Sequence, residues 1–252
     1  GFSTQAEVVD ENSGSQGLTG YEVWRSTMEN ITAQRHGNHY ADAYARMFLS
    51  SINTVVTLQR ILEGSTVEGY VASSTTEKKL HQVAKLISVR EARGAERDFF
   101  HLSRGGWDHH SDMKQNLAAK FTEVDTAVRG FVEEMEKQNV WGNVVLATES
   151  EFARTLDSNG GGSDHAWAGN HFIIGGGLKG GRIFNRYPAT VASGGPFELG
   201  RGRMIPEFPW ESVAVPVASW LGVSAADLNV AFPNLPHFSG QHLIDVSDLF
   251  LP

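Results

Sequence analysis

A long amphipathic stretch between two short apolar runs limits the possible folds of this chain more than any other feature. Apolar residues recur at three- and four-residue steps through 113–135, which predicts a helix over 112–138 with one face on a core. The run 98–103 is short, aromatic-rich and closed by Gly105 and Gly106, and the run 143–148 is apolar and follows Gly142, so both are predicted to be buried strands. This strand–helix–strand order favours an α/β fold with a mostly parallel sheet and helices on both of its faces.

Metal-capable side chains follow these predicted strands. Because the carboxyl ends of neighbouring parallel strands lie at one edge of a sheet, we expect the loops after them to share a pocket. Imidazole and carboxylate together suit zinc, and a set richer in oxygen favours magnesium, manganese or calcium. For 105–110 taken alone, the alternative is a capped helix start with solvated histidines. The metal-capable side chains of these loops are Asp108 and His110, the carboxylates of 149–151, and the pair Asp164 and His165.

Several neighbouring residues are further candidates for the same pocket. The glycines of 159–163 allow backbone to approach an ion or anion closely, and their alternative is an exposed turn. Four more residues are candidates. His171 begins a strand predicted over 171–174, and the cations Lys179, Arg201 and Arg203 are candidate anion contacts.

The rest of the chain divides into three parts by pattern. Residues 1–20 are polar and aperiodic, which is typical of an extended or disordered lead-in. Residues 21–73 form a helical segment, with helices expected over 21–36 and 40–62, and residues 74–252 form the α/β domain. Ser74 and Glu77 make a capping box, and a helix is expected over 210–221 in spite of Pro216.

Bulk composition excludes several classes of protein and site. The net charge is −8, which argues against a nucleic-acid-binding surface. There are no cysteines, so disulfides, thiolate metal sites and cysteine nucleophiles are excluded. No apolar run reaches the length of a membrane span.

Four ordered motifs resemble an exported, mostly bacterial family known as domain-of-unknown-function family 1501, which is grouped with the alkaline phosphatase and sulfatase superfamily. The motifs are residues 105–110, 150–154, 162–165 and 175–182, and the resemblance covers about 74–238. The chain differs from the family pattern at Ala153 and Ala166, where the family usually has glycine. The resemblance implies a doubly wound α/β fold, divalent ions at the strand ends, and hydrolysis of phosphate or sulfate esters. By position it implies that the metal ligands are Asp108, His110, Glu151, Asp164 and His165. It also implies that Arg154 supports the site or contacts a substrate oxyanion, because a guanidinium fork matches tetrahedral anions. It also implies an exported or periplasmic location.

The same resemblance implies a strand followed by an aspartate and a hydroxyl nucleophile, which residues 1–73 do not contain. We therefore expect the amino-terminal part of the fold to be missing, and negligible ester hydrolysis by this chain alone. Two functions stay open. One is a metal-dependent hydrolase acting on small anionic esters, and the other is a catalytically silent scaffold or subunit of a larger assembly with a protein partner.

Overall fold

The computed structural model describes residues 20–35, 37–65, 67 and 69–252. Apart from Gly20, the lead-in predicted for residues 1–20 lies outside this range. The chain divides into two compact units, Gly1–Gly64 and Ser65–Pro252, and each is described by itself. Among the described residues, no helix is both long and apolar enough to cross a bilayer.

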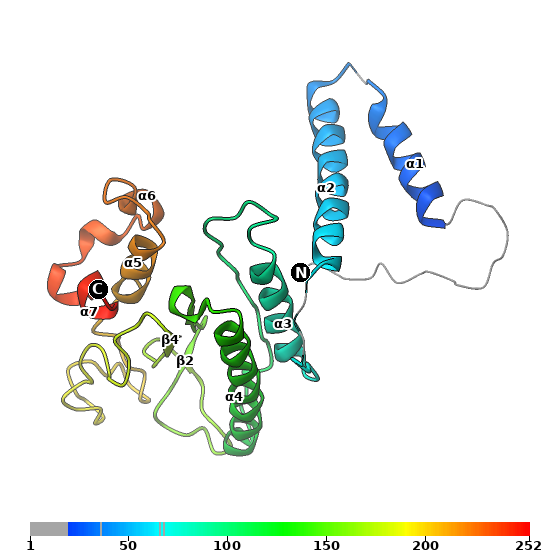
Figure 1. The fold of residues 1–252 in the computed structure, drawn as a ribbon. Helices are drawn as coiled ribbons and strands as arrows, with labels where there is room; N and C mark the ends of the chain where they lie inside the picture. Colours follow the sequence, from blue (N-terminus) through cyan, green and yellow to red (C-terminus); the bar gives the residue numbers. More distant parts are fainter. Residues whose placement is uncertain (1–19, 36, 66, 68) are drawn as a thin grey trace. The chain divides into compact units, whose positions relative to one another are not determined.

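The first unit contains two helices, α1 (Gly20–Ala33) and α2 (His39–Glu63), which contact each other (Figure 1). Asn38 begins α2 as its N-cap, because its side-chain oxygen accepts hydrogen bonds from the amides of Tyr40 and Ala41. Gly64 ends the helix. Both helices were predicted from periodicity, at nearly these positions.

The second unit begins with a pair of packed helices, α3 (Thr75–Ser88) and α4 (Met113–Lys137). The predicted capping box is present, with Ser74 and Glu77 each accepting a hydrogen bond from the other's backbone amide. Ala84 and Ala127 are fully buried, and alanine at such positions lets two helices approach closely. The core between the helices consists of Leu80, Val83, Ala84, Ala127, Phe131, Met135 and Val140.

Four short strands follow α4 and the 3-10 turn η1 (Trp141–Asn143). β1 (Val145–Ala147) pairs antiparallel with β4 (Ile173–Gly175), with Leu146 opposite Ile174. β2 (Ala153–Arg154) pairs antiparallel with β3 (His165–Ala166) to form a hairpin. Gly176 follows β4 where a Cβ atom would lie 2.8 Å from the backbone of Trp141, so glycine permits the close packing there.

The carboxyl-terminal part is built around α5 (Glu211–Trp220). Pro216 lies inside this helix and is fully buried, and the helix continues past it to Trp220, over nearly the range expected from the sequence. Ile244, Leu249 and Phe250 form a second buried cluster, against which the Trp220 ring stacks on Phe250. The remaining elements are α6 (Leu228–Ala231), η2 (Leu235–His237), η3 (Gly240–His242) and α7 (Val246–Leu249).

The prediction of a mostly parallel sheet with helices on both faces is wrong. Within the described residues, the strands form only two-stranded antiparallel sheets. The chain from Thr148 to Phe172 contains the β2–β3 hairpin and no helix, so no crossover returns it parallel to β1. The strand predicted over 98–103 is also wrong, because this stretch has no neighbouring strand and leaves Phe99 82% exposed.

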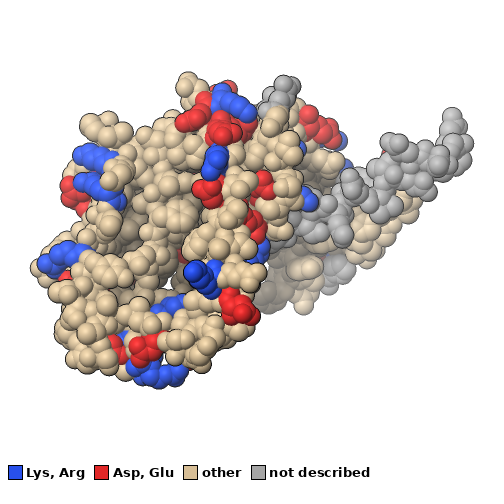
Figure 2. All heavy atoms as spheres, turned by 90° about the horizontal axis from the view of Figure 1, so that it is seen from below, with Lys and Arg blue, Asp and Glu red and all other residues tan. Residues whose placement is uncertain are grey.

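Charged side chains of both signs are mixed on the face of the molecule that Figure 2 draws. On this face, acidic and basic side chains lie next to one another rather than in separate fields. Two ion pairs of described residues are Arg104–Glu123 at 2.6 Å and Arg186–Glu207 at 2.7 Å. In each of these pairs an arginine neutralises the charge of a nearby glutamate.

Candidate metal centre

The first part of the candidate site is the irregular segment before α4. Gly106 has a φ of 82°, and a second left-handed residue, Asp112 at 49°, directly precedes the helix. Asp112 makes no side-chain cap, so the capped helix start considered for this stretch is not what the structure contains. The Trp107 ring packs on Phe121 of α4 with 5.4 Å between ring centroids, which anchors the segment that carries Asp108 and His110.

The second part of the site is the β2–β3 hairpin. Arg154 lies opposite His165 in its register, and the amide of Thr155 donates to the carbonyl of Asp164 at 2.8 Å. The hairpin loop is an Asx-type turn, since Asn159 Oδ1 accepts from the amides of Gly161 and Gly162. Those two amides already have partners, so they do not form an anion cradle.

Gly162 instead permits a close backbone contact. A Cβ atom at this position would lie 2.9 Å from both the carbonyl carbon and the carbonyl oxygen of His110. The glycine therefore allows the hairpin loop to pack directly on the backbone of a predicted ligand.

Arg154 joins the hairpin to the 105–110 segment. Its Nη1 donates to the carbonyl of Ser163 at 2.7 Å, and its Nη2 donates to the carbonyl of Trp107 at 2.8 Å. The same Nη2 lies 3.4 Å from Asp108 Oδ1. The side chain is only 20% exposed, and its contacts hold the two parts of the site together. Its predicted contact with a substrate oxyanion stays a prediction.

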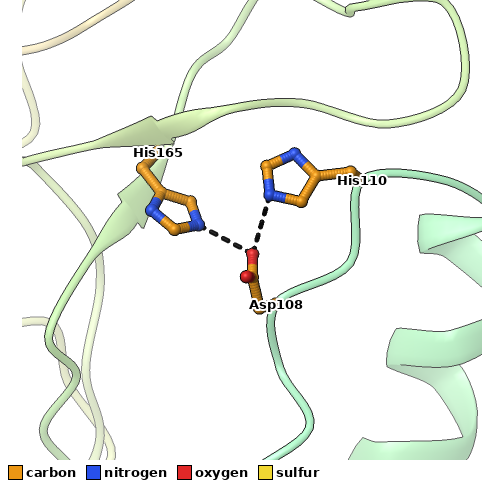
Figure 3. Close-up of side chains that lie close together, drawn as sticks. All are labelled: Asp108, His110 and His165. Carbon is orange, nitrogen blue, oxygen red and sulfur yellow. Dashed lines mark hydrogen bonds and ion pairs between the residues drawn. The ribbon is translucent and has the colours of Figure 1, made fainter.

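These contacts bring Asp108, His110 and His165 together, as Figure 3 shows. Asp108 Oδ1 lies 2.9 Å from His110 Nε2 and 2.7 Å from His165 Nε2, so both imidazoles meet the same oxygen. One ligand atom from each residue lies within 4.8 Å of the other two. About half of each of the three side chains is exposed to solvent, so a small ion has access to all three.

Asp164 lies on the other side of the His110 ring. Its Oδ1 is 3.5 Å from His110 Nδ1 and accepts a hydrogen bond from Asn159 Nδ2 at 2.9 Å, and its Oδ2 pairs with Arg201. The hydrogen bonds from Asn159 and Arg201 lower the pKa of Asp164 below its ordinary value. The hydrogen bond with His165, followed by the charges of both histidines and of Arg154, lowers the pKa of Asp108. Both aspartates are therefore carboxylates at neutral pH.

The structure does not bring Glu151 into this group. Glu151 is exposed, and it is not among the described residues whose ligand atoms converge. Its neighbour Glu149 pairs with His101 at 3.2 Å, away from the three ligands. Lys179 donates to the carbonyl of Ser247. The remaining candidates also have other contacts, His171 with the Trp210 ring and Arg203 with the carbonyls of Leu199 and Gly200.

Sequence reasoning missed Phe152 and Asn159. The Phe152 ring stacks on His165 with 3.9 Å between ring centroids and an interplanar angle of 11°, which orients the imidazole. Asn159 supports both the turn and the carboxylate of Asp164. Asn159 precedes three glycines, a turn signal that could have identified it, whereas nothing in the sequence marks the Phe152 stack.

The three residues fit a divalent ion of the zinc class. Two imidazoles and one carboxylate form the three-ligand set of many catalytic zinc sites, which leaves a position open. Tetrahedral ligands about 2.0–2.2 Å from an ion are separated by about 3.3 Å. Asp108 Oδ1 would therefore have to move from the two imidazole nitrogens by about 0.5 Å, and those two nitrogens lie within 4.8 Å of each other.

Comparison with known proteins assigns the chain to a family. No curated protein and no solved structure is significantly similar to this chain. Residues 22–193 match a protein family, and this range includes every predicted metal ligand and Arg154. The match begins earlier and ends earlier than the resemblance seen in the sequence, and it carries no superfamily assignment. The chain belongs to the family described as "Protein of unknown function (DUF1501)".

Proposed function

We propose that Asp108, His110 and His165 bind one divalent metal ion, and that this ion serves the hydrolysis of phosphate or sulfate esters. The observation that carries the proposal is the approach of three ligand atoms from two separate segments to within 4.8 Å of one another. Two nitrogen ligands and one oxygen ligand favour zinc over magnesium and calcium, which prefer oxygen. A bound ion would act as a Lewis acid that polarises an ester oxygen.

The protein's own residues account for how the site is held. Arg154 fixes the segment that carries Asp108 against the β2–β3 hairpin through two backbone carbonyls. Phe152 orients the ring of His165 by stacking. Because these supports are aromatic packing and charge-assisted hydrogen bonds, the three ligands are held near one another before an ion arrives.

Metal binding is the first test. Calorimetric titration of the protein with zinc, manganese, magnesium and calcium should give one zinc site that binds more tightly than magnesium or calcium. Asp108→Ala and His165→Ala should each abolish it, because two ligands from an exposed surface hold an ion poorly. His101→Ala is the matched control, since His101 is also an exposed histidine paired with a carboxylate but lies outside the cluster. Failure of wild-type protein to bind zinc would refute the metal site.

Ester hydrolysis is the second test. If the gene encodes a strand, an aspartate and a hydroxyl nucleophile besides these 252 residues, the protein that carries them, loaded with zinc, should hydrolyse p-nitrophenyl phosphate or p-nitrophenyl sulfate, and Asp108→Ala should remove that activity. The 252-residue chain by itself is expected to show negligible turnover, because residues 1–73 do not contain the strand, aspartate and hydroxyl nucleophile that the family resemblance implies. A protein that carries this nucleophile and binds zinc but hydrolyses neither ester would contradict the hydrolase and favour a metal-binding scaffold.

A further inference from the structure

We propose that Asp164 is a positioning residue that fixes the ring of His110 for metal binding, and that Arg201 and Asn159 hold Asp164 in place. This inference rests on the metal site proposed above. It changes the role that the sequence pattern predicted for Asp164, from a ligand to a group that orients a ligand.

The orientation of the His110 ring supports this role. Its Nε2 lies 2.9 Å from Asp108 Oδ1, and its Nδ1 lies 3.5 Å from Asp164 Oδ1. The two nitrogens of an imidazole point in different directions, so an ion bound by Asp108 and Nε2 lies across the ring from Asp164. A carboxylate at the non-ligating nitrogen keeps the proton on Nδ1 and leaves Nε2 free to bind a metal.

The distance of 3.5 Å is longer than a formed hydrogen bond. A shift of a few tenths of an ångström in the ring or the carboxylate would close it. Such a shift is of the same size as the movement that an ion requires of Asp108, so both adjustments fit one small rearrangement of the site.

Asp164 itself has little freedom to become a ligand. Oδ1 already accepts from Asn159, and Oδ2 pairs with Arg201. Its backbone amide and carbonyl are both bound to Thr155 of the hairpin. The backbone of Asp164 is thus fixed by two hydrogen bonds, and its carboxylate, held by Asn159 and Arg201, can face His110 but cannot turn to the ion without breaking those two side-chain contacts.

Arg201 reaches Asp164 from a loop with unusual backbone. It has a φ of 60° between Gly200 at 84° and Gly202 at 68°, and a non-glycine residue in this region is strained. A Cβ atom at Gly202 would lie 2.6 Å from the amide nitrogen of Asp157, so this loop packs directly on the hairpin. The strained backbone thus places a guanidinium on the carboxylate that faces His110.

Asp164→Asn is the decisive variant, because it keeps the size of the side chain and removes its charge. We expect zinc affinity to fall about 10- to 100-fold, the usual loss when the partner of a ligating histidine is removed. With cobalt as a spectroscopic probe, the shape of the visible absorption spectrum should be unchanged at saturation, since the ligands are the same. Nitrogen NMR of His110 should show a proton on Nδ1 in the wild type and a mixture of tautomers in the variant.

Arg201→Gln should lower zinc affinity in the same direction and leave the cobalt spectrum unchanged. Arg186→Gln is the matched control, since this exposed arginine pairs with Glu207 instead and its loss should not change affinity. Circular dichroism confirms that each variant is folded before the titrations are compared.

Two results would overturn the inference while leaving the metal site intact. A changed cobalt spectrum in Asp164→Asn would show that Asp164 is a ligand, and an affinity within about twofold of wild type would show that it has no role. Absence of any zinc or cobalt binding by the wild type would refute the metal site itself, and the positioning role with it.

Discussion

Replacement of Gly162 by alanine tests the contact that places the hairpin loop on His110. The new Cβ atom would lie 2.9 Å from the carbonyl carbon and oxygen of His110, whereas ordinary contacts begin at 3.4 Å. The His110 backbone must therefore move by about 0.5 Å, and overpacking of this kind costs about 1–3 kcal/mol. If the loop relaxes in the free protein and has to return for metal binding, zinc affinity should fall about 5- to 150-fold.

Gly161→Ala is the matched control for this variant. A Cβ atom at Gly161 would lie 3.5 Å from Ser111, an ordinary contact, and neither glycine has a positive φ. This variant should keep its zinc affinity and lose no stability, since alanine at a compatible site gains about 0.4–1 kcal/mol. Urea denaturation and zinc titration of both variants give the comparison. Equal effects at the two positions would refute the argument that the Gly162 contact positions His110.

Three further variants test other parts of the structure. Arg154→Lys should weaken zinc binding, because an ammonium cannot span two carbonyls as the guanidinium fork does, and calorimetry measures the loss. Phe131→Ala removes a core ring that is 2% exposed and should cost about 3–5 kcal/mol in urea denaturation. Glu123→Gln tests a pH dependence, since the hydrogen bond from Arg104 lowers the pKa of Glu123 from 4.5 to about 2. A lowered folded-state pKa stabilises the protein above pH 4.5, and this contribution is lost as the pH falls towards 2. The stabilities of wild type and Glu123→Gln should therefore differ above pH 5 and converge near pH 2.

Local signals in the sequence predicted the helices well and the sheet poorly. The helix from Met113 to Lys137 and the capping box at Ser74 follow from side-chain spacing over a few turns, which the sequence displays directly. Strand pairing depends on which segments meet in space. The run 143–148 does contain β1, but its partner comes back antiparallel because no helix separates it from β4.

The failed prediction of a strand at 98–103 has a different physical cause. An apolar run of this length fits a buried strand or an irregular segment that places one ring in a core, and periodicity cannot separate the two. In the structure, Phe100 packs against the α3–α4 core and Phe99 is exposed. The core between the two helices takes one aromatic ring from this segment and needs no strand there.

Sequence reasoning reached the three residues of the candidate site from a topology that the structure does not have. The expected route was a shared edge of a parallel sheet. The structure instead brings His165 to Asp108 through the β2–β3 hairpin, in which His165 lies opposite Arg154 and Arg154 binds the carbonyl of Trp107. Glu151 was predicted from the same topology, and its exposed side chain is not among the ligand atoms that converge. The residues that converge are those held by contacts between side chains and backbone, so the Arg154 clamp and the Gly162 contact account for the site without a sheet edge.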